Sequence, residues 1–285
     1  MMDAPQEFHY RLPYRVGGWR PGAHPGTRLG AGQEFVSHIS LYARPDPRRL
    51  DLRASLRDLS GDWLVRVHRQ HASVTVQAVV DVSASMAFGA RKTKLQVAAD
   101  FVEALGQSAG RVGDAVGMLA FDAEERADLF VPAVVRRGIG ALMASVLRRA
   151  ETAARGFEGL EAAVQRIAGR RGLIFLVSDF HWPLARLNAI LDLLAHAYVV
   201  PIIIWDPAEI EPPALDALAP LHDAESGARR TLWLRPKLRS QWRDAVARRR
   251  TQLDALFAPR AMRPFYVVGA FDAEAMSQYF LEAGA

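Results

Sequence analysis

The sequence predicts an α/β fold: a doubly wound, mostly parallel sheet, preceded by an irregular and partly β N-terminal extension. Strand-like and helix-like segments alternate from residue 74 to the C-terminus, the pattern of a parallel sheet covered on both faces. Several strand-like segments are continuously apolar, as buried parallel strands are. Before residue 70, Gly and Pro recur over residues 17–26, which is typical of loops.

The strands of the sheet are predicted from short apolar runs rich in Val, Ile and Phe. In chain order they cover residues 74–81, 114–121, 127–131, 172–178, 198–205 and 264–268. Longer amphipathic stretches between them predict helices over residues 93–109, 138–152, 158–169, 184–196, 237–257 and 272–282. A short hairpin fits residues 220–234, with Ser226 and Gly227 at its turn.

The domain organisation follows from the change of pattern near residue 72. A chain of 285 residues is at the upper end of what one domain holds. We expect residues 1–72 to form an extension with one or two short strands that packs on the main body. The alternation in WLVRVHRQ (63–70) indicates one of them. Residues 73–285 then form the α/β domain.

Several classes of protein are disfavoured by composition. There is no cysteine, so disulfides, thiolate metal sites and thiol nucleophiles are excluded. The longest apolar runs, such as 198–205, are far shorter than the about 20 residues needed to span a bilayer. The first 15 residues carry acids and have no apolar core of a secretory signal, so we expect a cytoplasmic protein without a membrane span.

The positive charge is concentrated near the C-terminus. The net charge is +5, and residues 235–263 contain nine Lys or Arg against only Asp244 and Asp254. This strip can attract phosphates or an acidic protein face. It can equally be the solvated side of an amphipathic helix. The buried stripe of such a helix would contain Leu238, Trp242, Val246, Leu253 and Phe257.

The residues that point to function follow two of the predicted strands. Asp81, Ser83 and Ser85 stand at the carboxyl end of strand 74–81, and LIFLVSDF carries a second strand into Asp179. Carboxyl ends of parallel strands meet at one edge of a sheet, where ligand sites form. Hydroxyl and carboxylate oxygens suit Mg²⁺ or Mn²⁺, and an ion with few carboxylates keeps an open position for a partner's acid. Alternatively, each residue simply caps the helix that follows.

These residues carry a family resemblance. The sequence resembles a von Willebrand factor A (VWA) domain, a Rossmann-like fold whose metal-ion-dependent adhesion site begins with Asp-x-Ser-x-Ser and includes a later strand-end aspartate. Asp81, Ser83, Ser85 and Asp179 match these positions. More narrowly, it resembles bacterial A-domain proteins of unknown function encoded beside MoxR-type AAA+ ATPases. The matching stretches are GAGQEF (30–35), DPRRLDLRAS (46–55), VGDAVGMLAF (112–121), LVSDF (176–180) and PLHDAESG (220–227).

The resemblance implies a function. It suggests a non-catalytic, Mg²⁺- or Mn²⁺-dependent adaptor or co-chaperone that works with a MoxR-type AAA+ ATPase or its client. Such pairs act in metalloenzyme maturation or complex assembly, and some members are linked to methanol dehydrogenase. The family's site also uses a threonine, where this sequence has Glu158. Either Glu158 joins the metal shell as a further carboxylate, or the site is closed, altered or metal-free.

Two other functions compete with this interpretation. A Mg²⁺-dependent phosphohydrolase would also use strand-end aspartates, and Arg91, Lys92 and Lys94 follow Ser85 closely. His181 could then act as a general acid or base, although a polar loop residue or a partner contact fits it as well. Nucleic-acid binding agrees with the arginine content, but aromatic residues are not regularly interleaved with the basic strip and no recognised binding motif appears.

Overall fold

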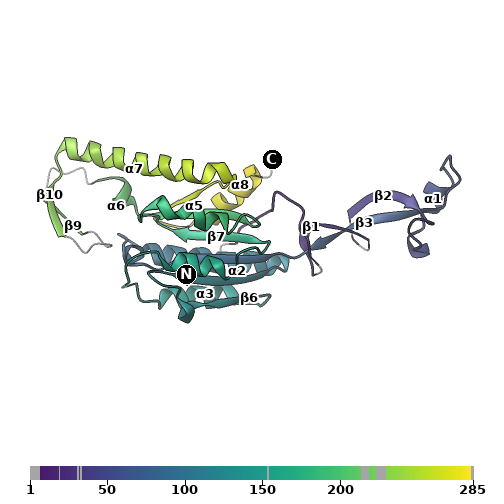
Figure 1. Ribbon diagram of the computed structural model, residues 1–285, viewed down its shortest axis with the longest axis horizontal. Coiled ribbons are helices and arrows are strands. Elements are labelled where there is room, and N and C mark those ends of the chain that lie inside the picture. Colours follow the sequence, from purple (N-terminus) through teal and green to yellow (C-terminus); the bar gives the residue numbers. More distant parts are fainter. Residues whose placement is uncertain are drawn as a thin grey trace. The chain divides into compact units, whose positions relative to one another are not determined.

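The computed structural model describes residues 7–18, 20–30, 32, 34–152, 154–212, 218–222 and 229–283 (Figure 1). The chain forms two compact units, one made of Met1–Tyr10 with Thr75–Ala285 and the other of Arg11–Val74. The second unit therefore ends two residues beyond the predicted boundary. Residues 7–10 belong to the α/β unit and not to the extension, in which the sequence analysis placed them.

The α/β unit is built on a six-stranded sheet in the order β11-β8-β7-β4-β5-β6. All neighbouring strands are parallel except β5 and β6, which are antiparallel. The strands are β4 (Thr75–Asp81), β5 (Ala115–Phe121), β6 (Val131–Val134), β7 (Leu173–Ser178), β8 (Tyr198–Trp205) and β11 (Phe265–Val268). The fold is thus mixed α/β with a largely parallel sheet, as predicted.

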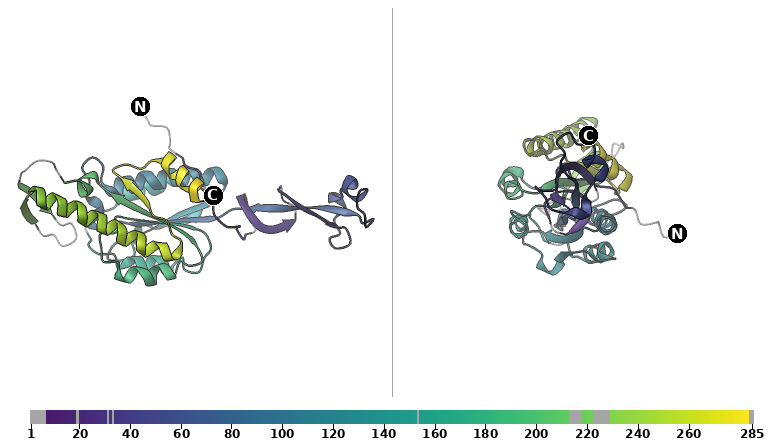
Figure 2. Two further views of the ribbon diagram at one scale, coloured as in Figure 1. Left: turned by 90° about the horizontal axis from the view of Figure 1, so that it is seen from above. Right: turned by 90° about the vertical axis from the view of Figure 1, so that its right-hand side faces the viewer.

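Helices cover both faces of this sheet (Figure 2). They are α2 (Lys94–Val112), α3 (Ile139–Arg148), α4 (Gly159–Gln165), α5 (Leu187–Asp192), α6 (Pro207–Ile210), α7 (Pro236–Phe257) and α8 (Ala273–Ala283). On one face, buried residues of α4, α5 and α7 form a single core with Ile174 and Leu176 of β7. On the other face Phe175 packs edge-on against Phe101 of α2 and Phe280 of α8. Neighbouring residues of a strand point to opposite faces, so the continuous apolar run of β7 supplies both cores.

Most predicted elements agree with the structure. β8 covers the predicted residues 198–205, and β4, β5, β7 and β11 each start one residue later than predicted. The strand predicted at 127–131 is wrong: residues 127–129 form a 3₁₀ turn and β6 starts at Val131. The reason is Arg126, which binds both Asp122 and Asp128 and holds the chain in a turn.

Three of the predicted helices are longer than the observed ones, whereas α2 continues three residues beyond its predicted end at residue 109. The helix predicted at 138–152 ends at Arg148, and the one predicted at 158–169 ends at Gln165. The segment 184–196 forms a 3₁₀ turn followed by α5. The hairpin is present as β9 (Leu218–His222) and β10 (Arg229–Trp233), while its predicted turn at Ser226 and Gly227 lies outside the described residues.

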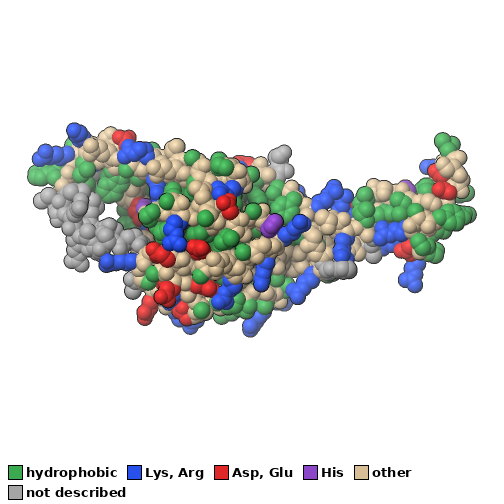
Figure 3. All heavy atoms as spheres, in the orientation of Figure 1, with side chains coloured by type: hydrophobic (Ala, Val, Ile, Leu, Met, Phe, Trp, Pro, Cys, Tyr) green, Lys and Arg blue, Asp and Glu red, His purple; other side chains and the backbone are tan. Residues whose placement is uncertain are grey.

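Helix α7 confirms the predicted apolar stripe. Leu253 and Phe257 are fully buried, whereas Leu238, Trp242 and Val246 are half-buried. Lys and Arg side chains lie on its exposed surface (Figure 3). Proline at the first helical position needs no intrahelical partner for its nitrogen, which explains the start at Pro236. None of the described helices is both long and apolar enough to cross a membrane.

The Arg11–Val74 unit contains more strand than predicted. Its sheet has the order β1-β3-β2 and consists of β1 (Pro21–Gly30), β2 (Glu34–Ser40) and β3 (Leu64–Ala72), with the short α1 (Leu52–Ser55) between β2 and β3. The Gly- and Pro-rich residues 21–26, predicted as loop, lie in the edge strand β1. A Cβ atom at Gly22 or Gly26 would meet β3 or the residue after it at 2.3 Å, so glycine permits this close pairing.

Residues 7–10 pack into the core of the α/β unit. Phe8 is fully buried and stacks with Phe101 and Phe280. The Phe8 amide donates to Ser108 Oγ at 2.8 Å, and the Tyr10 hydroxyl donates to Asp114 Oδ2 at 2.6 Å. The N-terminal segment therefore fills a place on the face of the sheet that α2 and α8 cover.

Candidate functional site

The carboxyl ends of β4 and β7 bring the predicted site residues together. β4 and β7 are adjacent and parallel, and the following strands of the chain are added outward on either side of this pair. Such a change of direction is where sheets of this type form ligand sites. Asp81 ends β4, and Asp179 directly follows β7. Both side chains are fully buried.

Asp81 accepts hydrogen bonds at both carboxylate oxygens. Its Oδ1 accepts from the Ser83 amide at 2.9 Å. Its Oδ2 accepts from Ser178 Oγ at 2.6 Å and from Trp182 Nε1 at 3.2 Å. Burial, followed by the neighbouring negative charge of Asp179, raises the pKa of Asp81 from 3.8 to about 6. Keeping Asp81 ionised at neutral pH therefore lowers the free energy of unfolding.

The two serines connect Asp81 with Asp179. The Ser83 backbone amide donates to Asp81 Oδ1, and Ser83 Oγ lies 3.2 Å from Ser85 Oγ, within hydrogen-bond distance. The nearby Ser85 hydroxyl is one of the groups that lower the pKa of the Asp179 carboxyl against the effect of its burial. Ser83 is extended, and Ser85 lies in the 3₁₀ turn Ala84–Ala87. The four residues Asp81, Ser83, Ser85 and Asp179 thus form one buried chain of neighbouring polar side chains.

A buried lysine completes this chain. Lys94 Nζ lies 2.5 Å from Asp179 Oδ2 and 2.7 Å from Glu209 Oε1, and only 2% of the lysine side chain is exposed. Burial acts against both charges, but the Lys94 ammonium holds the pKa of Asp179 below its usual value. The two carboxylates raise the pKa of Lys94 in spite of its burial. Lys94 and Asp179 are therefore both charged at neutral pH.

The turn after β7 is held in a strained conformation. Phe180 has φ +52°, which is unusual for a residue with a side chain. Trp205 Nε1 donates to the Asp179 carbonyl at 2.9 Å, and Arg249 of α7 donates to the carbonyls of Phe180 and Trp182. α7 thus fixes the turn that positions Asp179.

Glu158 does not join this chain. It directly precedes α4, its side chain is exposed, and its Oε2 accepts from the Phe157 amide at 3.0 Å. Within the described residues, no hydrogen bond connects it with Asp81, Ser83 or Ser85. The expectation that Glu158 supplies a further carboxylate has no support in these contacts.

The sequence analysis missed Glu209, Trp182 and Arg249, and considered Lys94 only as a phosphate-binding group. Glu209 had a detectable signal, because β8 also ends in an acidic stretch, WDPAE (205–209). Asp206 and Glu209 form a reciprocal cap at the start of α6. The Asp206 carboxylate also accepts from the Ala90 amide at 2.9 Å, which ties α6 to the loop that precedes Lys94.

The site residues fit a hard divalent cation in type and spacing. Adjacent ligands of an octahedral Mg²⁺ are about 3 Å apart, and Ser83 Oγ and Ser85 Oγ are separated by 3.2 Å. Asp81, Asp179 and Glu209 carry more negative charge than Lys94 neutralises, which favours a further cation. Asp179, His181 and Glu209 also offer ligand atoms within 4.8 Å of one another. Lys94 already binds two of these three residues.

A hollow of about 580 Å³ adjoins this site. Trp205, Ile210, Trp242 and Val246 give it an apolar lining, and His181, Glu209 and Arg249 supply its polar groups. His181 is partly exposed, and its Nε2 lies 3.9 Å from Glu209 Oε1. A molecule bound in this hollow would therefore touch the residues next to Asp179.

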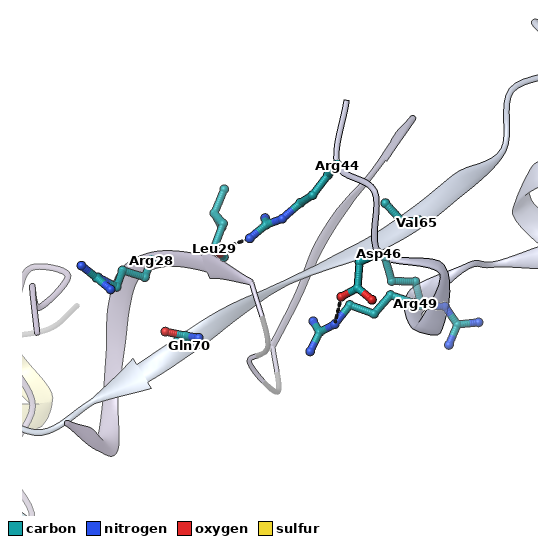
Figure 4. Close-up of a pocket in the computed structure, with 8 residues that line it drawn as sticks. Arg28, Leu29, Arg44, Asp46, Arg49, Val65 and Gln70 are labelled. Carbon is teal, nitrogen blue, oxygen red and sulfur yellow. Dashed lines mark hydrogen bonds and ion pairs between the residues drawn. The ribbon is translucent and has the colours of Figure 1, made fainter. Parts of the chain in front are cut away.

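The Arg11–Val74 unit has a hollow of its own, of about 600 Å³ (Figure 4). Its lining includes the four arginines Arg28, Arg44, Arg49 and Arg66. Arg44 donates to the Leu29 carbonyl at 2.8 Å, and Arg49 pairs with Asp46 at 3.3 Å. Residues 11–74 contain eleven arginines and five acids, so the positive charge is not confined to the basic strip at 235–263.

The raised pKa of Asp81 predicts how stability depends on pH. The folded carboxyl has the higher pKa, so the unfolded chain loses this proton first as pH rises, and stability falls between about pH 4 and pH 7. The lowered pKa of Asp179 has the opposite effect, but only below about pH 4. The neutral variant Asp81→Asn lacks the Asp81 contribution. Between about pH 4 and pH 7, the free energy of unfolding in urea should fall by a few kcal/mol more in wild type than in Asp81→Asn. A difference between the two proteins that does not change with pH would contradict the raised pKa of Asp81.

Comparison with known proteins gives the family. Residues 44–252 match the family model "Protein of unknown function DUF58". Uncharacterized proteins of Mycobacterium tuberculosis and Mycobacterium bovis are 30% identical over 239 residues, covering 81% of this chain and 73% of theirs.

Among solved structures, the conserved hypothetical protein BatB from Bacteroides thetaiotaomicron aligns with a TM-score of 0.47 and 16% identity, over 74% of this chain and 98% of that one. An aerotolerance-related membrane protein from Bacteroides fragilis gives a TM-score of 0.45 and 13% identity, with the same coverage. The match to the family model extends over most of the chain. The protein belongs to the DUF58 family, whose function is unknown.

Proposed function

We propose that this protein is a non-catalytic protein-interaction domain of the VWA type, which binds its partner at the edge formed by β4 and β7. One observation carries the proposal: Asp81, Ser83, Ser85 and Asp179 form one buried chain of neighbouring polar side chains at the junction of two parallel strands. The strand order also supports it, since reading outward from β4 and β7 gives the doubly wound order.

The cation of this site is Mg²⁺ or Mn²⁺ in our proposal. Ser83 and Ser85 would hold it with Asp81 and Asp179, directly or through water. A divalent ion supplies a positive charge with an open position, to which an acidic side chain of a partner can bind. The residues of this chain contribute the fixed geometry, because the serines are held between two buried carboxylates.

The proposed partner is a MoxR-type AAA+ ATPase or the client of such an ATPase. In this proposal the pair works in the cytoplasm on metalloenzyme maturation or complex assembly, for example on methanol dehydrogenase. The support is the resemblance of residues 30–35, 46–55, 112–121 and 176–180 to proteins encoded beside such ATPases. Residues 44–252 also match the DUF58 family model.

A phosphohydrolase is the competing function, because a lysine lies beside the strand-end aspartate. Lys94 is 2% exposed and binds two carboxylates, so it is poorly placed to contact a phosphate. An assay with p-nitrophenyl phosphate and Mg²⁺ separates the two functions. Turnover that Ser83→Ala abolishes would support the enzyme and contradict a non-catalytic domain.

The adaptor function predicts the result of a binding experiment. The double variant Ser83→Ala/Ser85→Ala should lose at least about tenfold in affinity for a purified MoxR-type ATPase in Mg²⁺, because both hydroxyl ligands are removed. Binding can be measured by calorimetry with the ATPase from the same genome. EDTA should weaken wild type to a similar degree. Glu158→Gln, which changes an exposed side chain outside this buried chain of polar side chains, is the matched control and should bind like wild type.

If wild type and the double variant bind equally, or if EDTA has no effect on either, the proposed metal-dependent interface is wrong. The serines are preferable to Asp81 for this test. Asp81 accepts three hydrogen bonds from buried donors, so its removal would disturb the fold as well as the site.

A further inference from the structure

We infer that the Lys94 ammonium is a tethered cation that competes with a divalent ion for Asp179, and that Glu209 retains the ammonium when the ion enters. This inference rests on the proposed cation site and describes how that site is regulated. It starts from a simple observation: the carboxylate expected to face the metal already has a positive charge 2.5 Å away, supplied by the chain itself.

Lys94 is held at this position by its backbone and by its surroundings. It is the first residue of α2, and Thr93 and Gln96 form a reciprocal cap around that helix start. The aromatic ring of Phe88 lies 5.8 Å from the ammonium. Because the side chain is 98% buried, the ammonium cannot exchange its carboxylate partners for water without a rearrangement of the site.

A divalent ion and this ammonium repel each other when both contact Asp179. In a buried site this repulsion is much stronger than in water, because little solvent screens the charges. Ion binding therefore requires Lys94 to withdraw from Asp179 or to share it at reduced affinity. In the absence of the ion, Lys94 holds the Asp179 carboxylate in place through the ion pair of 2.5 Å.

The Glu209 carboxylate can bind the Lys94 ammonium when the ammonium withdraws from Asp179. Its Oε1 lies 2.7 Å from Lys94 Nζ, while its Oε2 accepts from the Asp206 amide. Glu209 is 21% exposed, so its side chain has more freedom than the fully buried Asp179. The Trp242 indole donates to the Glu209 carbonyl at 2.7 Å, which connects α6 with α7. A shift of Lys94 toward Glu209 would therefore affect the apolar hollow beside the site, because Glu209 and Trp242 both line it.

The inference is tested by measuring Mn²⁺ affinity of the purified protein without any partner. Free Mn²⁺ is followed by electron paramagnetic resonance during titration. Lys94→Met, which keeps much of the side-chain length and removes the charge, should bind Mn²⁺ at least about tenfold more tightly than wild type. Lys92→Met is the matched control, because Lys92 is exposed and pairs with Asp100, and it should bind like wild type.

A second variant gives the opposite change and does not depend on the folding of Lys94→Met. Glu209→Gln leaves Asp179 as the one carboxylate on the ammonium, so Lys94 should hold Asp179 more firmly and Mn²⁺ should bind several-fold more weakly than in wild type. Circular dichroism confirms that each variant is folded. The inference is wrong if wild type and Glu209→Gln bind Mn²⁺ with equal affinity. It is also wrong if folded Lys94→Met binds Mn²⁺ no more tightly than wild type, or if neither of these two proteins binds it.

These outcomes are distinguishable from failure of the proposed function. Mn²⁺ affinity is read on the isolated protein, whereas the interaction domain is tested by capture of the ATPase. Tighter Mn²⁺ binding by Lys94→Met together with no ATPase binding would support the tethered cation and contradict the proposed partner.

Discussion

Lys94→Met is expected to lower the free energy of unfolding by about 3–5 kcal/mol at neutral pH. The reason is not the loss of the ion pair alone. Removing the ammonium leaves Asp179 fully buried without its cation, next to the buried carboxylate of Asp81. An uncompensated buried charge is much more costly than the absence of both partners. Urea unfolding followed by circular dichroism measures the change.

The neighbouring lysine provides the control. Lys92 pairs with Asp100 at 2.7 Å, but 54% of its side chain is exposed, and such surface pairs contribute about 0–1 kcal/mol. Lys92→Met should therefore be almost as stable as wild type. If the two methionine variants unfold at the same urea concentration, the buried ion pair contributes less to the free energy of unfolding than its geometry indicates.

The Lys94 variant also predicts a change with pH. At low pH the carboxylates become protonated, and a neutral carboxyl needs no cation. The stability difference between wild type and Lys94→Met should accordingly shrink as the pH falls through the range in which Asp179 takes up its proton. A difference that stays constant down to about pH 3 would show that lost packing, rather than charge, causes the destabilisation.

The sequence was sufficient to predict the part of the site that depends on strand order. Asp81 and Asp179 stand at the ends of apolar runs, and parallel strands place their carboxyl ends at one edge of a sheet. The proximity of the two aspartates can therefore be predicted from the sequence. The alternation of Asp81, Ser83 and Ser85 likewise placed the hydroxyls next to the first acid. Each of these inferences needed a local pattern and one general rule of sheet topology.

The partner of Asp179 could not be predicted in this way. Lys94 lies 85 residues from Asp179 and 115 from Glu209 in the sequence, and it begins a helix like many other lysines. Its burial depends on the position of α2 relative to the ends of β7 and β8. That position is set by side-chain packing over the whole sheet, on which the local sequence carries no information.

Two errors at the N-terminal side have a similar origin. Pro and Gly in residues 21–26 predicted a loop, but pairing with β3 overrides this local preference, and Gly22 and Gly26 make the pairing sterically possible. Residues 7–10 were assigned to the extension because the sequence predicts a single boundary, near residue 72. Phe8 is nevertheless placed by contacts with α2 and α8, about 100 and 270 residues later in the chain.

Phe8→Ala is expected to destabilise the α/β unit by about 3–5 kcal/mol. Phe8 is fully buried, and its ring lies 6.0–6.5 Å from those of Phe101, Phe175, Phe271 and Phe280. Truncation to alanine leaves a cavity between α2, α8 and the sheet, in addition to the lost burial of the ring. Thermal unfolding by calorimetry measures the effect, which should appear as a lower melting temperature of the α/β unit.

Phe35→Ala is the appropriate control for this substitution. Phe35 lies in β2 of the Arg11–Val74 unit and is 51% exposed, so its truncation removes little buried surface. A large effect of Phe8→Ala with a small effect of Phe35→Ala would show that the N-terminal segment is an integral part of the α/β core. Equal, small effects would mean that residues 7–10 detach without cost, and their assignment to the α/β unit would then be wrong.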